Sequence, residues 1–558
     1  MKEIISLLPY FKRYKWLLAG GAACVVFQNV FQVFIPISVR GAFNNVQQVL
    51  ISKNETPLNT AIIKFACIVI GLAILRGLFM FFMRQTLIIM SRRMEFDQRN
   101  AIYHHYQTLD SNFYKKNRTG DLMARLTEDV SRVRNFTGPA LMYLGNLITL
   151  IILVVYVMFH VNSSLAIYAL VPLPFLSLSV YFVNQVINKR SEKIQAQLSN
   201  LTTTSQETFS GIRVIQSFVQ ENAVQEHFEK ETLQYKNLSL SLAKVEAVYF
   251  PLLGLLIGAS VIAVVWRGGH LVALNQITTG NIAEFILYIT MLVWPVTSLG
   301  WVASTIQRAI VSQRRINEFM QVPSAIKNNS TEKMELKGKI EFQNVSVTYE
   351  NTGIQALKEI NFTIQPGEKI AIIGKNGIGK TTIAQLITRM LDASSGTIYI
   401  DDKPIEQWNL ADLRQQIGYV PQDVFLFSDT VKENILFGTD EKLPLSKIEN
   451  MAKIAAIHHE VIRLPNGYDT LIGERGVTLS GGQKQRISIA RALIKQPQIL
   501  LLDDCLSAVD ATTEALLMNS FKELFKGKTV INITHRTAHL SAFDKVFEIT
   551  EKGLVEMK

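Results

Sequence analysis

Two adjacent acidic residues, Asp503 and Asp504, follow a short apolar run in the segment QILLLDDCLSAVD at residues 498–510. The run Ile499–Leu502 is apolar throughout, which is typical of a strand buried on both faces of a parallel sheet. Such a strand delivers both carboxylates to its carboxyl end. There, Asp503 is suited to hold the water shell of a Mg²⁺ ion, and Asp504 is suited to orient or deprotonate an attacking water. Both roles belong to the hydrolysis of a phosphate bond.

A phosphate-binding loop is predicted in the segment KIAIIGKNGIGKTTIAQL at residues 369–386. The strand-like run Ile370–Ile373 leads into a Gly-x-x-x-x-Gly-Lys-Thr pattern, and a helical pattern follows. In this context backbone N–H groups wrap the phosphates, and the helix N-terminus adds partial positive charge. Lys380 is expected to reach the outer phosphates and the Thr381 hydroxyl to bind Mg²⁺, so ATP and Mg²⁺ are the predicted cofactors. The residues expected to contact ATP are Gly374, Lys375, Asn376, Gly377, Ile378, Gly379, Lys380, Thr381 and Thr382.

A second anion cradle is predicted in the segment LSGGQKQR at residues 479–486, where a serine and paired glycines precede a helical run. Since the first loop already serves one nucleotide, a second cradle is redundant unless it serves a different nucleotide. The economical arrangement is two such domains face to face, each lending its cradle to the ATP of the other. The cradle residues are Ser480, Gly481, Gly482 and Gln483.

The composition indicates that part of the chain lies in a membrane. Hydrophobic residues make up 48% of the 558 residues and charged residues only 18%. The net charge is +11, but residues 339–558 carry 25 Lys and Arg against 27 Asp and Glu, so the basic excess lies in the first part. A basic, apolar first part beside a near-neutral second part predicts a membrane domain fused to a soluble one. Nucleic acid is not expected as a partner, because basic nucleic-acid patches do not usually interrupt long apolar runs.

Six apolar stretches are long enough to cross a bilayer, which requires roughly 20 residues each. They lie at about 16–39, 61–83, 140–160, 164–186, 247–268 and 281–303. The segments 84–139 and 187–246 are rich in Arg and Lys, which places them in the cytoplasm with the N-terminus and everything after residue 303. Both segments keep a helical spacing of apolar residues, interrupted around Asn117–Gly120 and at Gly211. Each is therefore predicted to be a helical hairpin that leaves the membrane and returns.

Arg76 lies in the middle of the second apolar stretch, where an ionisable side chain is by default a candidate for substrate binding. The alternative is that Arg76 faces the interior of the helix bundle or extends to the membrane surface. Phe31, Phe34, Phe79 and Trp294 either line the same cavity or serve only in packing. No substrate can be identified from these residues.

The order of these motifs resembles that of ATP-binding cassette (ABC) exporters, in the form of a half-transporter, over essentially the whole chain. LSGGQ together with a phosphate-binding loop and an aspartate-ended strand is highly specific for that family. The resemblance implies that Tyr349 stacks on adenine, that Gln422 contacts Mg²⁺ and the attacking water, and that His535 grips the γ-phosphate. The implied metal ligands are Thr381, Gln422 and Asp503, and the implied catalytic residues are Asp504, His535 and Gln422.

Further segments resemble connecting elements of the same family. The loop Gly473–Gly476 resembles the exporter-specific loop before the LSGGQ signature, and Ser507–Asp510 resembles the loop that crosses the dimer interface. The hairpin tips around Ser111–Lys116 and around Glu207–Ile215 resemble the two coupling helices that dock into the ATPase domains.

The implied fold is an all-α six-span transmembrane domain with long cytoplasmic helical extensions, fused to an α/β P-loop ABC nucleotide-binding domain. The expected boundaries are residues 1–320 for the transmembrane domain, 321–337 for a linker and 338–558 for the nucleotide-binding domain. The expected location is the cytoplasmic membrane, in contact with lipid, with the nucleotide-binding domain in the cytoplasm.

Asp504 departs from the family pattern, because fully active members usually carry Glu at this position. The exchange removes one methylene, so the carboxylate retreats by roughly 1–1.5 Å if the backbone stays in place. A general base must lie within about 3 Å of its proton, and a misplacement of about 1 Å costs on the order of 10²-fold in rate. ATP binding is therefore expected to survive, whereas hydrolysis at this site is expected to be slow.

This asymmetry resembles one half of a heterodimeric ABC exporter in which one ATP site is degenerate. The favoured interpretation is export of small amphipathic or apolar compounds, drug-like or lipid-like, together with a second half-transporter that supplies the catalytic Glu. A slower homodimer, in which Asp504 works through a shifted water, is the direct alternative. An exporter of lipid or peptide, an importer with the exporter fold, and a regulatory subunit that binds ATP without transport also remain open. The six spans argue against a soluble ABC protein that acts on DNA or the ribosome.

Overall fold

The computed structural model describes residues 2–52, 56–350, 352–473, 476, 479–536, 540–550 and 553–557. The chain forms two compact units. The first consists of Met1–Tyr106 and Gly120–Val322, and the second of Gln107–Thr119 and Pro323–Lys558. The stretch Gln107–Thr119, which runs from the end of one long helix to the start of the next helix of the first unit, therefore groups with the second unit. The domain boundaries expected from the sequence, with a linker at 321–337, remain a prediction.

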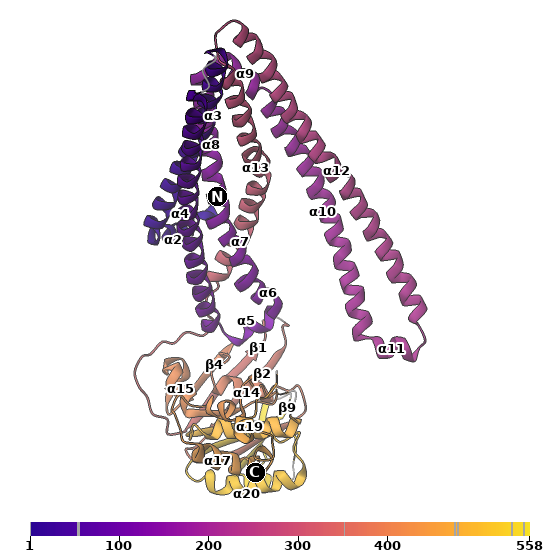
Figure 1. The fold of residues 1–558 in the computed structure, drawn as a ribbon. Coiled ribbons are helices and arrows are strands. Elements are labelled where there is room, and N and C mark those ends of the chain that lie inside the picture. Colours follow the sequence, from indigo (N-terminus) through magenta and orange to yellow (C-terminus); the bar gives the residue numbers. More distant parts are fainter. Residues whose placement is uncertain are drawn as a thin grey trace. The chain divides into compact units, whose positions relative to one another are not determined.

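The first unit is built from helices (Figure 1). A helix satisfies its backbone hydrogen bonds internally, which any segment inside a bilayer must do. The helices are α1 Lys2–Ile5, α2 Leu8–Arg13, α3 Lys15–Ser52, α4 Thr56–Thr108, α6 Thr119–Ala124, α7 Val130–Asn135, α8 Leu141–Val161, α9 Ser163–Leu170, α10 Pro172–Ser210, α11 Ile212–Ser217, α12 Glu221–Ala273 and α13 Thr279–Met320. Two short π-helical turns, Arg125–Asp129 and Phe136–Ala140, connect α6, α7 and α8.

Within the described residues, five helical stretches are long and apolar enough to span a membrane. They are Lys15–Val49, Ile62–Thr108, Thr119–Val161, Glu221–Ala273 and Thr279–Met320. The remaining predicted span, 164–186, is not among them. Its apolar run is divided between α9 and the beginning of α10, because Pro172 begins a new helix after Val171. The unit is thus a helical membrane domain with five such spans, and the sixth remains a prediction.

Both predicted helix breaks are confirmed. The first lies between α5 (Ser111–Lys116) and α6, where Asn117 is the C-cap of α5. The second lies at the tip of the hairpin formed by α10 and α12, which lie side by side and are joined by α11 (Figure 1). Gly211 ends α10, and its backbone N–H donates to the carbonyl oxygen of Glu207 at 2.8 Å.

A closed polar network joins α13 to α3 in the interior of the first unit. Glu284 is fully buried, and its carboxylate accepts a hydrogen bond from Nη1 of Arg40 at 3.1 Å. Oη of Tyr288 donates to the same carboxylate at 3.3 Å, and Nδ2 of Asn281 lies 3.4 Å from it. A buried charge is tolerated when it is paired and hydrogen-bonded in this way.

The second unit contains two sheets, an antiparallel one with strand order β2-β1-β4-β5 and a larger one with order β10-β9-β3-β8-β7-β6. In the larger sheet β3 pairs in parallel with β8 and β9, and β7 pairs in parallel with β6 and β8. The strands are β1 Ile340–Thr348, β2 Gln355–Ile364, β3 Lys369–Gly374, β4 Ser395–Ile400, β5 Lys403–Pro404, β6 Ile417–Val420, β7 Ile499–Asp503, β8 Thr529–Ile533, β9 Lys545–Thr550 and β10 Gly553–Glu556. The helices are α14 Lys380–Ile387, α15 Leu410–Gln416, α16 Val431–Leu436, α17 Leu445–Ile454, α18 His458–Val461, α19 Gly481–Leu493 and α20 Ala511–Leu524.

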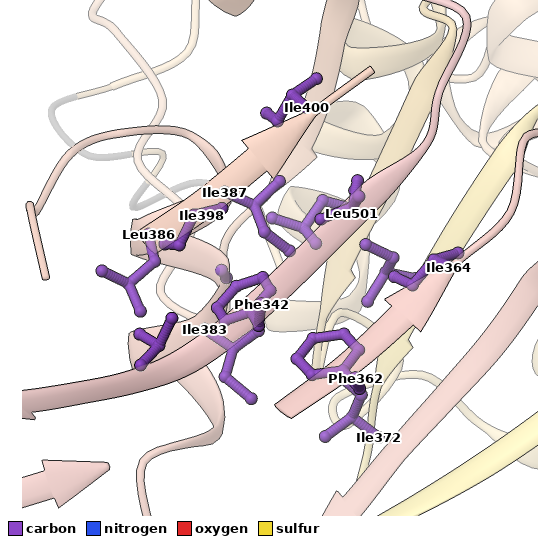
Figure 2. Close-up of a cluster of buried hydrophobic side chains, with 14 of the residues drawn as sticks. Phe342, Phe362, Ile364, Ile372, Ile383, Leu386, Ile387, Ile398, Ile400 and Leu501 are labelled. Atoms are coloured by element: carbon purple, nitrogen blue, oxygen red, sulfur yellow. The ribbon is translucent and has the colours of Figure 1, made fainter. Parts of the chain in front are cut away.

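A core rich in isoleucine connects the two sheets to α14 (Figure 2). Phe342 of β1 stacks on Phe362 of β2, with ring centroids 4.5 Å apart. Ile372 of β3, Ile383 of α14 and Leu501 of β7 belong to the same buried cluster. Tightly packed cores deform little, so this cluster provides a rigid support for the loop between β3 and α14.

The carboxyl ends of β3 and β7 lie at the same edge of the larger sheet. Ile372 of β3 and Asp503 of β7 both pair with Ile533 of β8, which lies between the two strands. The loop after β3 and the acidic residues after β7 therefore share one edge, where ligands bind in open α/β sheets.

Candidate functional site

The loop between β3 and α14 has a backbone that only glycine adopts readily. Gly374 and Gly379 have φ angles of +152° and +103°, in the region that side chains with a Cβ atom disfavour. A Cβ atom at Gly379 would overlap the carbonyl oxygen of Ala356, and one at Gly374 would lie 2.9 Å from the carbonyl oxygen of Ile549. The two outer glycines of the predicted phosphate loop are thus required by its geometry.

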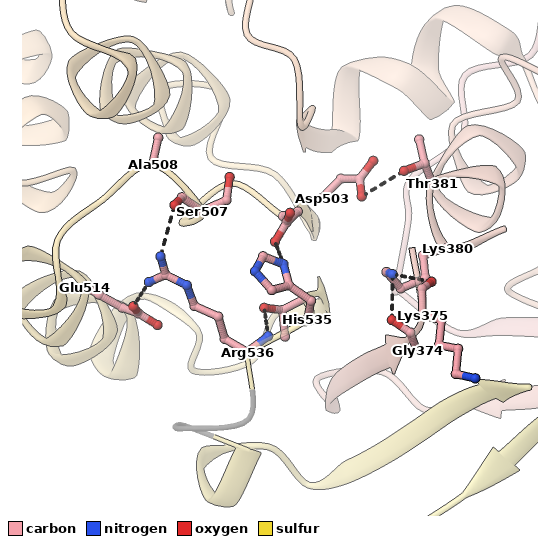
Figure 3. Close-up of polar contacts among 12 residues, drawn as sticks. Gly374, Lys375, Lys380, Thr381, Asp503, Ser507, Ala508, Glu514, His535 and Arg536 are labelled. Carbon is pink, nitrogen blue, oxygen red and sulfur yellow. Dashed lines mark hydrogen bonds and ion pairs between the residues drawn. The ribbon is translucent and has the colours of Figure 1, made fainter. Parts of the chain in front are cut away.

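Lys380 lies across this loop (Figure 3). Its Nζ donates to the carbonyl oxygens of Gly374 at 2.8 Å and Lys375 at 2.9 Å. Burial lowers the pKa of Lys380, and the nearby Asp504 and Asp503 carboxylates oppose that shift. A partly desolvated cation held over a glycine loop is suited to bind phosphate oxygens.

Asp503 faces α14. Its side chain is 1% exposed, Oδ1 accepts a hydrogen bond from Thr381 Oγ1 at 3.3 Å, and Oδ2 accepts one from Tyr419 Oη at 3.5 Å. Burial raises the pKa of Asp503, because desolvation disfavours the charged carboxylate. Both hydrogen bonds are long, so the carboxylate is only weakly satisfied within the chain.

The oxygen atoms of Thr381 and Asp503 fit a Mg²⁺ ion. Mg²⁺ prefers hard oxygen ligands and commonly uses one or two protein groups, with phosphate and water as the others. No group of three or more His, Cys, Asp or Glu side chains that could hold a metal occurs in the described part of the chain. A metal site there would accordingly draw most of its ligands from a bound nucleotide and water.

Asp504 contacts the loop after β8, whereas Asp503 contacts Thr381 of α14. Oδ1 of Asp504 lies 2.9 Å from Nδ1 of His535, so the two predicted catalytic residues contact each other directly. The Asp504 side chain is 13% exposed and the His535 side chain 47% exposed. Asp504 has a φ of +46°, a left-handed conformation that Asp tolerates better than most residues. The two adjacent acids therefore serve different neighbours.

Tyr349 directly follows β1 and contacts α14. Its Oη lies 3.0 Å from Oγ1 of Thr382, which places the predicted adenine-stacking ring beside the first turn of the phosphate-loop helix. Nζ of Lys115, in α5 of the same unit, lies 5.7 Å from the centroid of the Tyr349 ring. Lys116 and Glu350 form an ion pair at 3.5 Å. The first predicted coupling helix thus contacts the loop that carries the aromatic ring.

The LSGGQ segment caps the start of α19. Oγ of Ser480 accepts a hydrogen bond from the backbone N–H of Gln483 at 3.3 Å, and Oε1 of Gln483 accepts one from the backbone N–H of Ser480 at 2.8 Å. Nε2 of Gln483 also donates to Glu460 at 2.8 Å. Within the described residues, no hydrogen bond or ion pair joins Ser480, Gly481, Gly482 or Gln483 to the loop Gly374–Thr381. The two predicted cradles are therefore separate in one chain, as a face-to-face pair of domains requires.

Residues that the sequence did not single out support this arrangement. Gln485 donates to Oγ of Ser507 at 3.1 Å and accepts from the backbone N–H of Ala508 at 3.1 Å, which ties α19 to the segment Ser507–Asp510. Tyr419 reaches Asp503 from the end of β6. The signal for Tyr419 was its place in the strand that precedes Gln422.

For two predicted elements, the described residues show no side-chain hydrogen bond to the rest of the site. Gln422 is exposed two residues after β6, at the same sheet edge as Asp503, and no hydrogen bond of its side chain occurs among the described residues. Within the loop Gly473–Gly476, Glu474 and Arg475 lie outside the described residues. The roles assigned to both elements remain predictions.

Comparison with known proteins gives two family matches, one described as "ABC transporter transmembrane region" at residues 17–296 and one described as "ABC transporter" at residues 357–507. The chain is 31% identical over 550 residues to the "Multidrug resistance-like ATP-binding protein MdlA" of Escherichia coli (strain K12), covering 98% of this chain and 92% of that protein. It is 37% identical over 467 residues to the "Probable multidrug resistance ABC transporter ATP-binding/permease protein YheI" of Bacillus subtilis (strain 168), covering 83% and 79%. It is 32% identical over 560 residues to the "ATP-dependent lipid A-core flippase" of Acinetobacter baylyi (strain ATCC 33305 / BD413 / ADP1), covering 100% and 95%.

Proposed function

Because the chain belongs to the ABC transporter family as an exporter-type half-transporter, we propose that it helps to move amphipathic or apolar compounds outward across the cytoplasmic membrane. ATP closes a pair of nucleotide-binding domains, the coupling helices relay the closure, and the spans change from inward-facing to outward-facing. Drug-like and lipid-like substrates are supported by the relatives, which are named as multidrug resistance proteins and as a lipid A-core flippase.

The residues around the phosphate loop have distinct proposed roles. Lys380 binds the outer phosphates, Tyr349 stacks on adenine, and His535 binds the γ-phosphate. Thr381 and Asp503 hold Mg²⁺, which neutralises charge that develops on the phosphates. Support for these roles comes from the burial of Asp503, from its long hydrogen bond to Thr381 and from the position of Tyr349 against α14.

The observation that carries the proposed slow hydrolysis is the contact between Asp504 and His535. The carboxylate is one methylene shorter than Glu, and it already accepts a hydrogen bond of 2.9 Å if Nδ1 of His535 carries the proton. To act on a water at the γ-phosphate, Asp504 would have to give up that contact and still reach roughly 1 Å farther. A misplaced base of this kind costs on the order of 10²-fold in rate.

The proposed partner is a different half-transporter that carries Glu at the corresponding position. ABC half-transporters work as dimers, and a homodimer of this chain would contain two Asp504 sites and no longer acid. The segment Ser480–Gln483 keeps a complete capping box, so it remains shaped to serve the ATP of a partner. At the tip of the α10–α12 hairpin, Phe209, Phe218 and Val219 are 76%, 71% and 79% exposed. Exposed apolar side chains at such a tip fit a surface that another protein covers.

The test of the partner is purification of the tagged chain followed by mass spectrometry. We expect a second half-transporter with Glu at the position that matches Asp504. Inside-out vesicles that contain the pair should accumulate an amphipathic dye when ATP is supplied. If the chain purifies only with copies of itself and still transports the dye, the homodimeric alternative is correct.

The proposed difference between the two ATP sites is tested with two variants of the purified pair. Asp504→Glu in this chain should preserve or raise turnover. Glu→Gln in the partner should abolish turnover, since it removes the only well-placed base. Equal losses from Asp504→Asn and from the partner's Glu→Gln would contradict the proposed asymmetry.

A further inference from the structure

Two adjoining cavities lie among the membrane helices of the first unit. The smaller, of about 440 Å³, is lined by residues of α3, α4, α8 and α13. The larger, of about 920 Å³, is lined by residues of α8, α12 and α13. Tyr143, Thr290 and Trp294 line both cavities, so a molecule that fills one can extend into the other past these side chains.

Two unpaired arginines line the smaller cavity, Arg76, which is half-buried, and Arg84, which is exposed. Arg76 and Arg84 line it from α4, with Met80 between them. Residues at this spacing lie close to one face of a helix and about 12 Å apart along its axis. Within the described part of the chain, neither guanidinium forms a hydrogen bond or ion pair, and no acidic side chain lines the cavity. Arg40 of α3, by contrast, is paired with Glu284.

An unpaired cation among membrane helices, such as Arg76, is costly, and it occurs where a water-filled cavity or a ligand accommodates it. A guanidinium presents several N–H donors in a planar fork that matches carboxylate and phosphate groups. The pair Arg76 and Arg84 therefore selects for negative charge at this end of the cavity.

The smaller cavity also contains an unsatisfied acceptor. Gln28 of α3 is 5% exposed, and its Nε2 donates to Oδ1 of Asn146 at 2.7 Å. That bond fixes the amide, and Oε1 of Gln28 is left buried without a hydrogen-bond partner. A buried acceptor without a partner destabilises the protein, so a ligand that brings an O–H or N–H group gains affinity there.

The larger cavity has a different chemical character. Aromatic side chains line it from three helices, namely Tyr143 from α8, Tyr249 from α12, and Trp294 and Trp301 from α13. No charged residue lines this cavity. Such a surface suits a hydrocarbon chain or a ring system, and it offers an anion no positively charged partner, although aromatic rings attract cations modestly.

We propose that the two cavities form one binding site for an anionic amphipathic compound. Arg76 and Arg84 bind its phosphate, sulfate or carboxylate group through charge-assisted hydrogen bonds. Oε1 of Gln28 accepts a hydrogen bond from a neighbouring hydroxyl or amide group of the ligand. The apolar body of the ligand occupies the aromatic cavity. The inference rests on the proposed export of amphipathic compounds, and it adds the sign of the charge on the substrate.

The experiment uses the fluorescence of Trp294, which lines both cavities. The purified full-length transporter, in an uncharged detergent and without nucleotide, is titrated with bromoalkyl probes of one chain length that carry a phosphate, a trimethylammonium or a maltoside group. Bromine quenches tryptophan fluorescence, and the difference from the Trp294→Phe variant isolates the signal of this site. A brominated phosphatidic acid tests whether a two-chain lipid binds better than a single-chain compound.

The phosphate probe should bind at least about tenfold more tightly than the ammonium probe. Arg76→Gln and Arg84→Gln should each weaken binding of the phosphate probe by about tenfold and leave the maltoside probe within about twofold. Arg93→Gln is the matched control, because Arg93 is exposed on the same helix and lines neither cavity. Arg76→Lys, which retains a charge, should retain the preference for the phosphate probe.

Equal binding of the phosphate and ammonium probes would overturn the proposal. So would Arg76→Gln and Arg84→Gln variants that bind the maltoside probe normally and bind the phosphate probe as Arg93→Gln does. The binding titration needs no ATP, so a negative result would not contradict the proposed ATPase cycle. A failure of that cycle would likewise leave the charge preference measurable.

Discussion

Glu284 in the membrane unit and Asp503 in the nucleotide-binding unit are both buried carboxylates, at 0% and 1% exposure, yet their surroundings differ. Glu284 lies within hydrogen-bonding distance of Arg40, Tyr288 and Asn281, and the ion pair with Arg40 measures 3.1 Å. Asp503 has only the long hydrogen bonds from Thr381 and Tyr419. A carboxylate that is fully hydrogen-bonded to neighbouring helices, as Glu284 is, holds those helices together. A carboxylate with only long hydrogen bonds, as Asp503 has, is available to bind a ligand.

The same contrast separates the arginines of the membrane unit. Arg40 is paired inside a closed network, while Arg76 and Arg84 line a cavity without partners among the described residues. Satisfaction of the charge by the protein therefore separates Arg40 from the two arginines that we propose to bind substrate.

Asp503→Asn should have the largest effect on activity and a small effect on stability. In an Asp504→Glu background, where hydrolysis is measurable, the rate should fall on the order of 10³-fold, because the Mg²⁺ ion that we propose Asp503 holds would lose its protein carboxylate. Thermal unfolding should change little, since an amide at this position carries no buried charge. Asp440→Asn, at an exposed acid, is the control for both measurements. A rate that stays within about tenfold would mean that Asp503 does not hold the metal.

Breaking the polar network around Glu284 should instead have a large effect on the stability of the protein. Glu284→Ala should cost about 1–3 kcal/mol of unfolding free energy, because it removes the partner of Arg40, whose side chain is 30% exposed, and an acceptor for Tyr288. The double variant Arg40→Met, Glu284→Leu should recover much of this loss, since the buried charge disappears with its desolvation penalty. Denaturation in detergent, followed by helix content, measures both quantities.

Glu226→Ala supplies the reference for that comparison. Glu226 pairs with Lys230 on the surface of α12, where both side chains are mostly exposed. Loss of such a pair should change the free energy of unfolding by about 0–1 kcal/mol. A loss from Glu284→Ala no larger than this value would show that the buried network is not what anchors α13 to α3.

The smallest predicted effect concerns Lys115 and Tyr349. A cation 5.7 Å from the centroid of a ring contributes roughly 0.5–1 kcal/mol at a partly exposed site. Lys115→Ala should therefore weaken ATP binding about two- to fivefold, because it loosens the Tyr349 ring, which we propose stacks on adenine. The effect should vanish in a Tyr349→Ala background, as a double-mutant cycle with a fluorescent nucleotide measures. An effect that persists without the ring would assign Lys115 another role.

The open site of the nucleotide-binding unit could largely be predicted from the sequence, because its parts are local. The glycine pattern at 374–381 specifies its own loop, and the apolar run before Asp503 specifies a strand whose end meets that loop. The contact between Asp504 and His535 could not be foreseen, since it depends on the side-chain directions after two different strands.

The closed network and the membrane cavities could not be predicted, because they are assembled from distant segments. Arg40 and Glu284 lie 244 residues apart in the sequence and on different helices. Arg76 could be marked as unusual, but its partner helices and the aromatic cavity beside it depend on how α3, α8, α12 and α13 pack. The predicted span at 164–186 shows the same limit, because a continuous apolar run is divided by a new helix at Pro172.

The most direct test of the central claim is the rate of phosphate release from ATP by this chain alone, reconstituted in lipid vesicles. Slow release is expected, with an increase on the order of 10²-fold in Asp504→Glu and little change in Asp504→Asn. ATP binding should be similar in all three proteins. Rapid release by the unaltered chain that disappears in Asp504→Asn would show that the shorter acid is a competent base, and the need for a Glu-bearing partner would be contradicted.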